Sequence, residues 1–273
     1  MAFSSDVLTL DRDGAVATLW LDRPEARNAL GPDFWADLPR AMEVLADEDG
    51  VRAVVVAARG PAFTVGLDLK AMGPMLLQGG GGSDAQRHRR LYAEVKRMQA
   101  AITSVAACPK PVLAAVHGYC LGGGLDLITA CDLRLAAEDA VFSVRETKMA
   151  MVADLGTLQR LPSILPAGHV AELVFTGKDI DARRAHRIGL VNDVYADAGA
   201  VHAAAQTLAA EIAANAPLAV QGAKAVLRAG RDLSEAQALD YVALWNAAFL
   251  RSGDLQEALT AFMEKRAPAF TGT

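Results

Sequence analysis

The sequence predicts an α/β core followed by a C-terminal region made only of helices. Continuous apolar runs, such as VRAVVVAA at residues 51–58, are typical of strands buried on both faces. Strand-like and helix-like segments alternate from residue 51 to about residue 144, which indicates parallel strand pairing. After Asp197 every segment has the pattern of a helix. We therefore expect an α/β core over residues 1–196 and a helical region over residues 197–273.

The expected strands follow from local patterns. The runs VLTL and AVATLWL are strand-like, and Asp11 to Gly14 between them are typical of a hairpin turn. Pro109 and Pro111 mark the start of another buried strand, VLAAVHG. The strands are therefore expected at residues 7–10, 15–21, 51–58, 112–118, 133–137 and 191–195.

The remaining segments are expected to be helical or irregular. Pro32 suits the first turn of a helix, which we expect to end near Asp47. The stretch GPMLLQGGGGS, residues 73–83, is expected to be a flexible insertion. Its four glycines, Gly79 to Gly82, are a poor phosphate-binding loop because no strand precedes them and no helix follows immediately. Further helices are expected at residues 84–107, 197–214, 217–229, 234–251 and 254–266, with a short one in GGGLDLITACD.

The composition allows a sizeable core and excludes several functions. Of the 273 residues, 52% are hydrophobic and 22% are charged. The formal net charge of −5 lacks the basic footprint of a nucleic-acid binder. Charges or glycines interrupt every apolar run before the roughly 20 residues that a membrane helix needs. Because neither a signal-peptide pattern nor a Ser-Lys-Leu address is recognised, we expect a cytoplasmic protein.

The cysteines and common motifs point away from metal and redox chemistry. Cys108, Cys120 and Cys131 lack metal-site spacing and leave one cysteine over in any disulfide scheme, so we expect reduced core residues. The patterns GxGxxG, GKS/T, HExxH and GxSxG do not occur. We therefore expect no metal site and no redox cofactor.

Two glycine-rich turns follow buried strands. GPAFTVGLDL covers residues 60–69, and HGYCLGGGLD covers residues 117–126. Glycine permits close backbone approach, and the second turn leads into a helix whose N-terminal amides carry partial positive charge. Two such turns at neighbouring strand ends would aim two amides at one developing oxyanion. The alternative is that the glycines only permit tight strand-to-helix packing.

Two carboxylates occur in the otherwise apolar stretch RETKMAMVADLGTLQRL. Burial disfavours the charged forms of Glu146 and Asp154. Eight residues on one straight helix would separate them by about 12 Å, so they face one ligand together only across a bend. As alternatives, Glu146 forms a surface ion pair with Arg145 or Lys148, and Asp154 caps the following helix. Asp126, in the second glycine turn, would then only complement its helix dipole.

These motifs resemble the crotonase (enoyl-CoA hydratase/isomerase) superfamily. The resemblance covers about residues 7–266 and is carried by LDRPEARNAL, GPAFTVGLDLKAM, HGYCLGGGLDLITACDLRLAAEDAVFSV and LGTLQRLP. It implies a crotonase-like spiral of ββα units with a C-terminal helical trimerisation region, usually in hexamers of two trimers. It also implies acyl-CoA thioester substrates, and an oxyanion hole formed by the backbone N–H groups of Leu67 and Gly123.

The carboxylates indicate one branch of this superfamily. Simple hydratases carry two glutamates at the positions of Asp126 and Glu146, and typically a glycine at that of Asp154. The trio found here resembles the Δ3,5-Δ2,4-dienoyl-CoA isomerase branch, as does DYVALWNAAFL. That branch moves the double bonds of 3,5-dienoyl-CoA to the 2,4 positions in fatty-acid β-oxidation. By analogy, Asp154 removes the C2 proton, Glu146 supplies one at C6, and Asp126 supports the pair.

The resemblance also implies how the substrate is held. Coenzyme A enters as part of the thioester, and the last two of the candidate binding residues would contact the CoA of a neighbouring subunit. These candidates are Arg27, Val65, Gly66, Asp68, Leu69, Lys70, Phe262 and Lys265.

Two other functions remain open. An enoyl-CoA hydratase (a lyase) would use Asp126 and Glu146 on either side of a water, with Asp154 dispensable. A non-catalytic acyl-CoA-binding protein would need none of the three acids, so their joint presence favours an enzyme.

Overall fold

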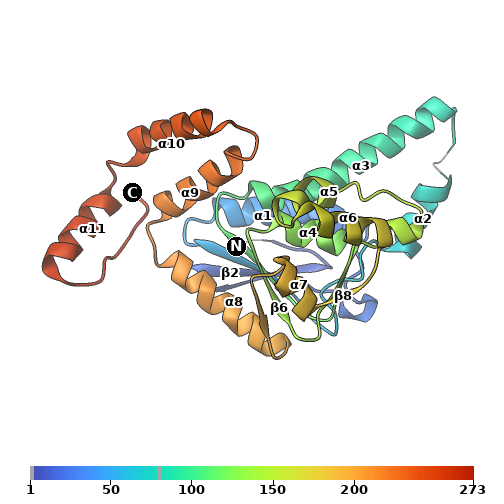
Figure 1. Ribbon diagram of the computed structural model, residues 1–273, viewed down its shortest axis with the longest axis horizontal. Coiled ribbons are helices and arrows are strands. Elements are labelled where there is room, and N and C mark those ends of the chain that lie inside the picture. Colours follow the sequence, from blue (N-terminus) through green and yellow to red (C-terminus); the bar gives the residue numbers. More distant parts are fainter. Residues whose placement is uncertain (1–2, 79–80) are drawn as a thin grey trace.

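The computed structural model describes residues 3–78 and 81–273, and its core is a six-stranded sheet (Figure 1). The strand order is β1-β2-β3-β4-β6-β9, so β1 and β9 are the edges. β1 and β2 form an antiparallel hairpin, and every other neighbouring pair in this sheet is parallel, as the alternation of elements predicts. The strands are β1 (Leu8–Asp13), β2 (Val16–Leu21), β3 (Ala53–Ala58), β4 (Val112–Val116), β6 (Leu133–Ala137) and β9 (Asp193–Tyr195).

A second, three-stranded sheet was not expected from the sequence. Its order is β5-β7-β8, with β5 (Tyr119–Leu121), β7 (Val141–Ser143) and β8 (Ile180–Asp181). β5 directly follows β4 and β7 directly follows β6, so the chain steps from the large sheet into the small one before each crossover. Strands of two or three residues are too short for an alternating pattern to reveal them.

The large sheet is buried on both faces because helices cover each side. Successive side chains of a strand point to opposite faces. Val54 and Val56 of β3 therefore pack with α1, α3 and α4, whereas Val55 and Ala57 pack toward α8. The helices are α1 (Pro32–Asp47), α2 (Leu69–Gln78), α3 (Asp84–Ala107), α4 (Gly123–Ala130), α5 (Thr157–Arg160), α6 (Ala167–Thr176), α7 (Ala182–Ile188), α8 (Ala198–Ala213), α9 (Pro217–Ala229), α10 (Glu235–Phe249) and α11 (Gly253–Glu264).

The C-terminal helices differ in their relation to this core. Val201, Ala205 and Ala209 of α8 are buried against the sheet, so this helix closes one of its faces. α10 and α11 extend away from the sheet (Figure 1) and expose large apolar side chains such as Leu244 and Phe262. The division at residue 196 stays a prediction, and α8 shows that the first helix beyond it belongs to the packed core.

Two local expectations are wrong. The hairpin turn is tighter than predicted, because Asp11 and Asp13 pair with Thr18 and Val16 inside the ladder and the chain reverses at Gly14, with φ of +56°. The supposed insertion at 73–83 is helical up to Gln78, since α2 continues through Pro74.

Part of that insertion is not described. Gly79 and Gly80 of the four-glycine run lie outside the described residues. The helix after the run begins with a capping box, in which Ser83 and Gln86 bond each other's backbone amides.

Hydrogen bonds attach the C-terminal residues 270–272 to the rest of the fold. The guanidinium of Arg52 donates to the carbonyl of Phe270 at 2.6 Å and to that of Ala213, at the end of α8, at 3.2 Å. The buried carboxylate of Asp254 accepts from the amides of Thr271 and Gly272. Among the described residues, no helix combines the length and apolarity that crossing a bilayer requires.

Candidate active site

The structure brings the two glycine turns into contact. The Thr64 amide donates to the carbonyl of Tyr119 at 2.8 Å, and the Leu121 amide donates to that of Thr64 at 3.2 Å. Gly66 has φ of +85°, and a Cβ there would lie 2.7 Å from the Leu121 carbonyl oxygen and 3.6 Å from the Gly123 nitrogen. Only glycine combines this conformation with so close an approach.

The two amides predicted for an oxyanion hole are available as donors. Gly123 is the first residue of α4, whose N-terminal amides have no partner within the helix. In the described part of the chain, neither the Leu67 nor the Gly123 amide donates to a protein acceptor. Their neighbours are engaged, because Leu30 donates to Gly66 and accepts from Asp68. The geometry therefore fits an anion-stabilising pair.

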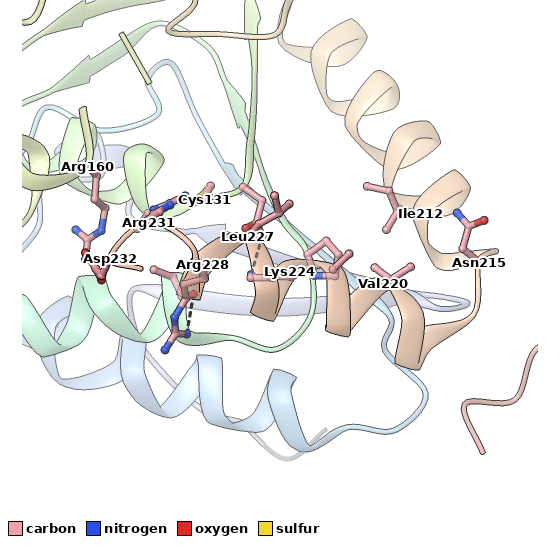
Figure 2. Close-up of a pocket in the computed structure, with 15 residues that line it drawn as sticks. Cys131, Arg160, Ile212, Asn215, Val220, Lys224, Leu227, Arg228, Arg231 and Asp232 are labelled. Atoms are coloured by element: carbon pink, nitrogen blue, oxygen red, sulfur yellow. Dashed lines mark hydrogen bonds and ion pairs between the residues drawn. The ribbon is translucent and has the colours of Figure 1, made fainter. Parts of the chain in front are cut away.

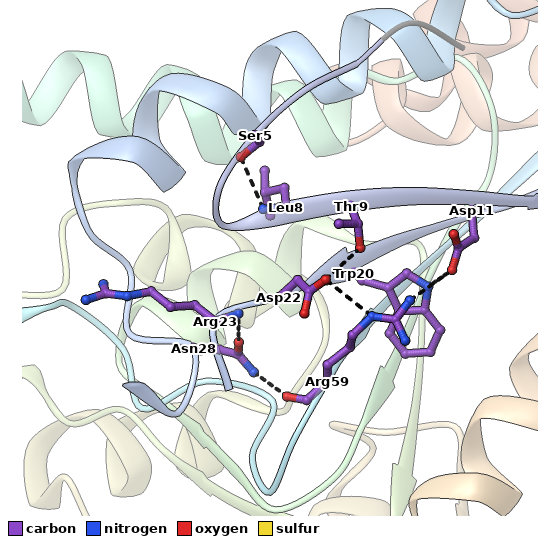
Figure 3. Close-up of polar contacts among 9 residues, drawn as sticks. All are labelled: Ser5, Leu8, Thr9, Asp11, Trp20, Asp22, Arg23, Asn28 and Arg59. Carbon is purple, nitrogen blue, oxygen red and sulfur yellow. Dashed lines mark hydrogen bonds and ion pairs between the residues drawn. The ribbon is translucent and has the colours of Figure 1, made fainter. Parts of the chain in front are cut away.

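A buried asparagine supports the first turn. Asn28, with φ of +54°, accepts from the Arg23 amide at 2.8 Å and donates to the carbonyls of Arg59 and Ala62 at 2.9 Å (Figure 3). Its own carbonyl accepts from the Thr64 hydroxyl at 2.6 Å. Asparagine tolerates this left-handed conformation better than most residues. Sequence reasoning missed this role, although Asn28 lies in the quoted motif LDRPEARNAL.

Arg59, at the start of the same turn, is held from its other side. Its guanidinium lies 4.5 Å from the ring centroid of Trp20 and contacts the carboxylates of Asp11 and Asp22 at 3.1 and 3.4 Å (Figure 3). The Trp20 indole N–H also donates to Asp11 at 2.7 Å. The hairpin β1–β2 thereby anchors the turn that Asn28 supports.

Asp68 makes its contacts within the protein. Its buried carboxylate accepts from the amides of Lys70 and Ala71 at the start of α2, and pairs with Arg23 at 2.7 Å. These contacts lower the pKa of Asp68, with the Ala71 amide bond as the largest cause. Both carboxylate oxygens are engaged within the protein, beside the Leu67 amide, and the CoA-binding role of Asp68 stays a prediction.

The Asp68→Asn variant is expected to be less stable at neutral pH by about 1–2 kcal/mol, because it weakens a helix cap and loses an ion pair. Since the folded pKa is depressed, the stabilisation is present above the unfolded value near 3.8 and is lost as pH falls through the folded pKa. Denaturant unfolding at pH 7 and in acid checks this. An equal difference in the free energy of unfolding between wild type and variant at both pH values would contradict this expectation.

The segment between Glu146 and Asp154 bends, as their spacing requires. Glu146 begins the short 3-10 helix η2 (Glu146–Met149), which ends at Ala150 in the left-handed conformation with φ of +57°. The chain then runs without regular structure to α5. The predicted bend is confirmed.

Asp126 is buried in α4 and caps a different helix. Its carboxylate accepts from the Thr157 amide, at the N-terminus of α5, at 2.6 Å. Burial is the main cause that raises the pKa of Asp126 to about 6, and the Asp154 charge adds to it. The alternative in which Asp154 caps this helix is wrong, because its N-cap position is occupied by Gly156.

Glu146 has an unused carboxylate oxygen. Within the described residues its Oε2 is buried without a hydrogen-bond partner, and its Oε1 would lie 3.2 Å from a Cβ placed on Gly122, beside the second glycine turn. The pKa of Glu146 is raised to about 7, mainly by burial and additionally by the charges of Asp126 and Asp154. The surface ion-pair alternative is wrong, because among the described residues Glu146 forms no ion pair with Arg145 or Lys148, and Arg145 pairs with Asp179 at 2.7 Å instead.

Asp154 is the most accessible of the three acids. The residue is exposed at the rim of the site, yet partial desolvation still raises its pKa. Its carbonyl accepts from the Gln99 side chain at 2.6 Å. The charge of Asp154 raises the pKa of Asp126, and the charges of both raise the pKa of Glu146, while the three acids differ in access to solvent.

The other predicted binding residues fall into two groups. Arg27, Leu69 and Lys70 are exposed around the first turn, where the Val65 amide donates to the Arg27 carbonyl at 3.2 Å. Phe262 and Lys265 belong to the end of α11, at the opposite end of the molecule from α2 (Figure 1). Within one chain the structure does not bring this second group to the acids.

Two of the cavities in the described structure lie beside the core helices. One, of about 650 Å³, lies between α2 and α3. Its lining combines Met72, Met75 and Leu91 with the charged residues Arg87, Arg90, Glu94 and Arg97, and none of the three acids lines it. The other, of about 560 Å³, lies between the end of α4, α8 and α9 (Figure 2). Arg160 reaches it from α5, but none of the three acids lines it.

Comparison with known proteins gives a consistent family. The sequence model of the enoyl-CoA hydratase/isomerase family matches residues 11–273. A peroxisomal Delta(3,5)-Delta(2,4)-dienoyl-CoA isomerase of Arabidopsis thaliana is 43% identical over 97% of this chain and 96% of its own length. The mitochondrial enzyme of Dictyostelium discoideum is 42% identical over 93% of this chain and 87% of its own.

Solved structures agree on the fold. An enoyl-CoA hydratase from Bacillus anthracis has a TM-score of 0.89 and 30% identity, covering 98% of this chain and 100% of that one. One from Mycobacterium tuberculosis H37Rv has a TM-score of 0.85 and 32% identity, covering 98% and 99%. The predicted crotonase-like architecture is confirmed.

The expected cytoplasmic location is contradicted, because these isomerase relatives are named peroxisomal or mitochondrial. The missing targeting patterns were too weak a basis for it. The family prediction, in contrast, is confirmed over nearly the whole sequence: this chain belongs to the enoyl-CoA hydratase/isomerase family.

Proposed function

We propose that this chain is a dienoyl-CoA isomerase of fatty-acid β-oxidation, which converts 3,5-dienoyl-CoA to 2,4-dienoyl-CoA. The observation that carries the proposal is the coupling of three acids beside the second glycine turn. The charges of Asp126 and Asp154 raise the pKa of Glu146, whose Oε1 lies next to Gly122, and among the described residues the Leu67 and Gly123 amides have no protein acceptor. The relatives named dienoyl-CoA isomerases, at 41–43% identity, support the same activity.

The reaction moves one proton off the substrate and one onto it. Asp154 removes a proton from C2, and the Leu67 and Gly123 amides stabilise the negative charge on the thioester oxygen. The electrons delocalise along the chain to C6, where Glu146 delivers its proton. The double bonds then lie at C2 and C4. Asp154 finishes protonated and Glu146 ionised, so a compensating proton exchange restores the site for the next turnover.

The burial and the pKa shifts of the acids support these roles. A proton donor must hold its proton near working pH, and Glu146 does so because its pKa is about 7. A base must be ionised, which suits the more accessible Asp154. Asp126 contributes through its charge, which raises the pKa of Glu146, and through its bond to the Thr157 amide, which fixes the start of α5.

Substrate binding follows from the same arrangement. CoA enters as part of the thioester and lies along the first turn, near Arg27, Val65, Gly66, Leu69 and Lys70. The cavity between α2 and α3 takes the acyl chain along its apolar lining of Met72, Met75 and Leu91. Phe262 and Lys265 contact the CoA of a neighbouring subunit in a trimer or a hexamer. The chemistry assigned to these carboxylates and amides requires neither a metal nor a further cofactor.

The rate of isomerisation is expected to fall as pH rises through about 7, because Glu146 then loses the proton that C6 needs. An acidic limb is expected where Asp154 becomes protonated. Steady-state rates between pH 5 and 9 check this profile. A rate that stays constant through pH 7 would remove Glu146 from the proton-donor role.

The direct test is ultraviolet absorbance of the purified protein mixed with a 3,5-dienoyl-CoA. Growth of the conjugated 2,4-dienoyl chromophore is the expected result. Absence of that signal together with consumption of a 2-enoyl-CoA would make the protein a hydratase. Asp154 would then be dispensable.

A further inference from the structure

The segment that carries Asp154 has few attachments of its own. Residues 152–155 lie between η2 and α5, outside any helix or strand, and bury the side chains of Ala153 and Leu155. Within the described part of the chain, their main-chain atoms make only two hydrogen bonds, in which the carbonyls of Asp154 and Leu155 accept from side chains. Apart from the packing of Ala153 and Leu155 in the core, the position of this backbone depends on those two donors.

Both donors connect the segment to α3. The Gln99 side-chain amide donates to the Asp154 carbonyl at 2.6 Å. Arg160 donates to the Leu155 carbonyl at 3.2 Å and, through its other terminal nitrogen, to the Thr103 hydroxyl at 3.1 Å. Gln99 and Thr103 are four residues apart on α3, so they share one face of that helix.

The local sequence makes room for this contact. Gly156 has φ of +127°, and a Cβ there would overlap the guanidinium of Arg160. Glycine at this position thus allows Arg160 to fold back along the segment toward α3. Gln99 is held in turn, because its side-chain oxygen accepts from Lys96 at 2.8 Å.

We propose that Gln99, Thr103 and Arg160 form a clamp that positions Asp154 for proton transfer, an inference that rests on the isomerase function proposed above. The carboxylate of Asp154 extends from the same residue whose carbonyl Gln99 holds. Loss of that bond lets the carboxylate move relative to Glu146 and to C2 of the substrate. A displacement of about 1 Å costs roughly a hundredfold in a well-positioned reaction. These three are positioning residues, since none of them touches the reacting atoms.

The test variant is Gln99→Glu, which keeps the size of the side chain and its contact with Lys96 but replaces the amide donor with an acceptor. Its kcat for 3,5-dienoyl-CoA is expected to fall about tenfold or more, with KM within about twofold of wild type. The matched control is Ser104→Ala, because the Ser104 hydroxyl bonds only the Ala101 carbonyl of its own helix. That control is expected to keep the wild-type kcat.

The thermal midpoint separates positioning from general destabilisation. In Gln99→Glu the thermal midpoint is expected to stay close to that of wild type while kcat falls. Thr103→Val, which removes only the hydroxyl partner of Arg160, is expected to lower kcat by a smaller factor in the same direction.

Three results would overturn the clamp. They are an unchanged kcat in Gln99→Glu, a fall in kcat that Ser104→Ala matches, and a loss accompanied by a large rise in KM and a lowered thermal midpoint. Wild-type protein without isomerase activity would instead refute the proposed function, so the two failures are distinguishable.

Discussion

The Asp154→Asn variant is expected to lose isomerase activity by about 10²–10⁴-fold in kcat, because an amide cannot accept the C2 proton. Substrate binding should change little, since the proposed CoA contacts lie along the first glycine turn. The thermal midpoint should also be kept, because Asp154 is exposed and its backbone carbonyl, not its carboxylate, bonds Gln99.

The measurement is the rate of 2,4-dienoyl chromophore formation by wild type and variant at pH 7. The matched control is Asp179→Asn, which removes a nearby exposed carboxylate that pairs with Arg145 outside the site. Equal rates for wild type and Asp154→Asn would end the assignment of Asp154 as the base. A loss in Asp179→Asn of the same size would mean that charge removal alone accounts for the effect.

The Glu146→Gln variant is expected to lose activity on the same scale while gaining stability. The lost proton donor accounts for the fall in kcat, again about 10²–10⁴-fold. The gain in stability arises because burial makes the charged form of Glu146 costly and raises its pKa from 4.5 to about 7. With the folded pKa above the unfolded one, the wild-type free energy of unfolding decreases as pH rises from about 4.5 to about 7. Glutamine does not ionise, so the free energy of unfolding of the variant does not show this decrease.

Thermal unfolding of both proteins at pH 5 and pH 8 gives the check. The Glu146→Gln midpoint should exceed that of wild type more at pH 8 than at pH 5. If the variant loses activity and also has a lower thermal midpoint than wild type at pH 8, the buried carboxylate stabilises the fold. That result would contradict the view that Glu146 is kept for chemistry at a cost in stability.

The fold was predictable where the sequence carries long patterns. The run VRAVVVAA became β3, and the alternation after it became parallel pairing, because burial on both faces requires continuous apolar residues. The short strands β5, β7 and β8 were missed, since two or three residues carry no periodic signal. α2 was missed because Gly73 and Pro74 suggest a loop, whereas helix packing overrides that local preference.

The sequence predicted the residue types of the site, but not the residues that hold the site in position. Glu146 and Asp154 were noticeable as acids in apolar sequence, and the glycine turns indicated close backbone approach. Asn28, Thr157 and Gln99 gave no comparable signal. Their roles depend on contacts between segments 31 to 55 residues apart, and polar residues are ordinary in a loop or on a helix surface.

The two edge strands of the large sheet, β1 and β9, are built in a way that opposes pairing with strands of other chains. An exposed edge strand offers unpaired amides and carbonyls that another strand can extend, which leads to aggregation. β9 presents only three residues, and the solvent end of β1 carries Asp11, Arg12 and Asp13. Short length and alternating charge both oppose strand addition. A high local concentration of this chain is therefore expected to leave the sheet at six strands, and neutral substitutions at Asp11 and Asp13 would weaken that protection.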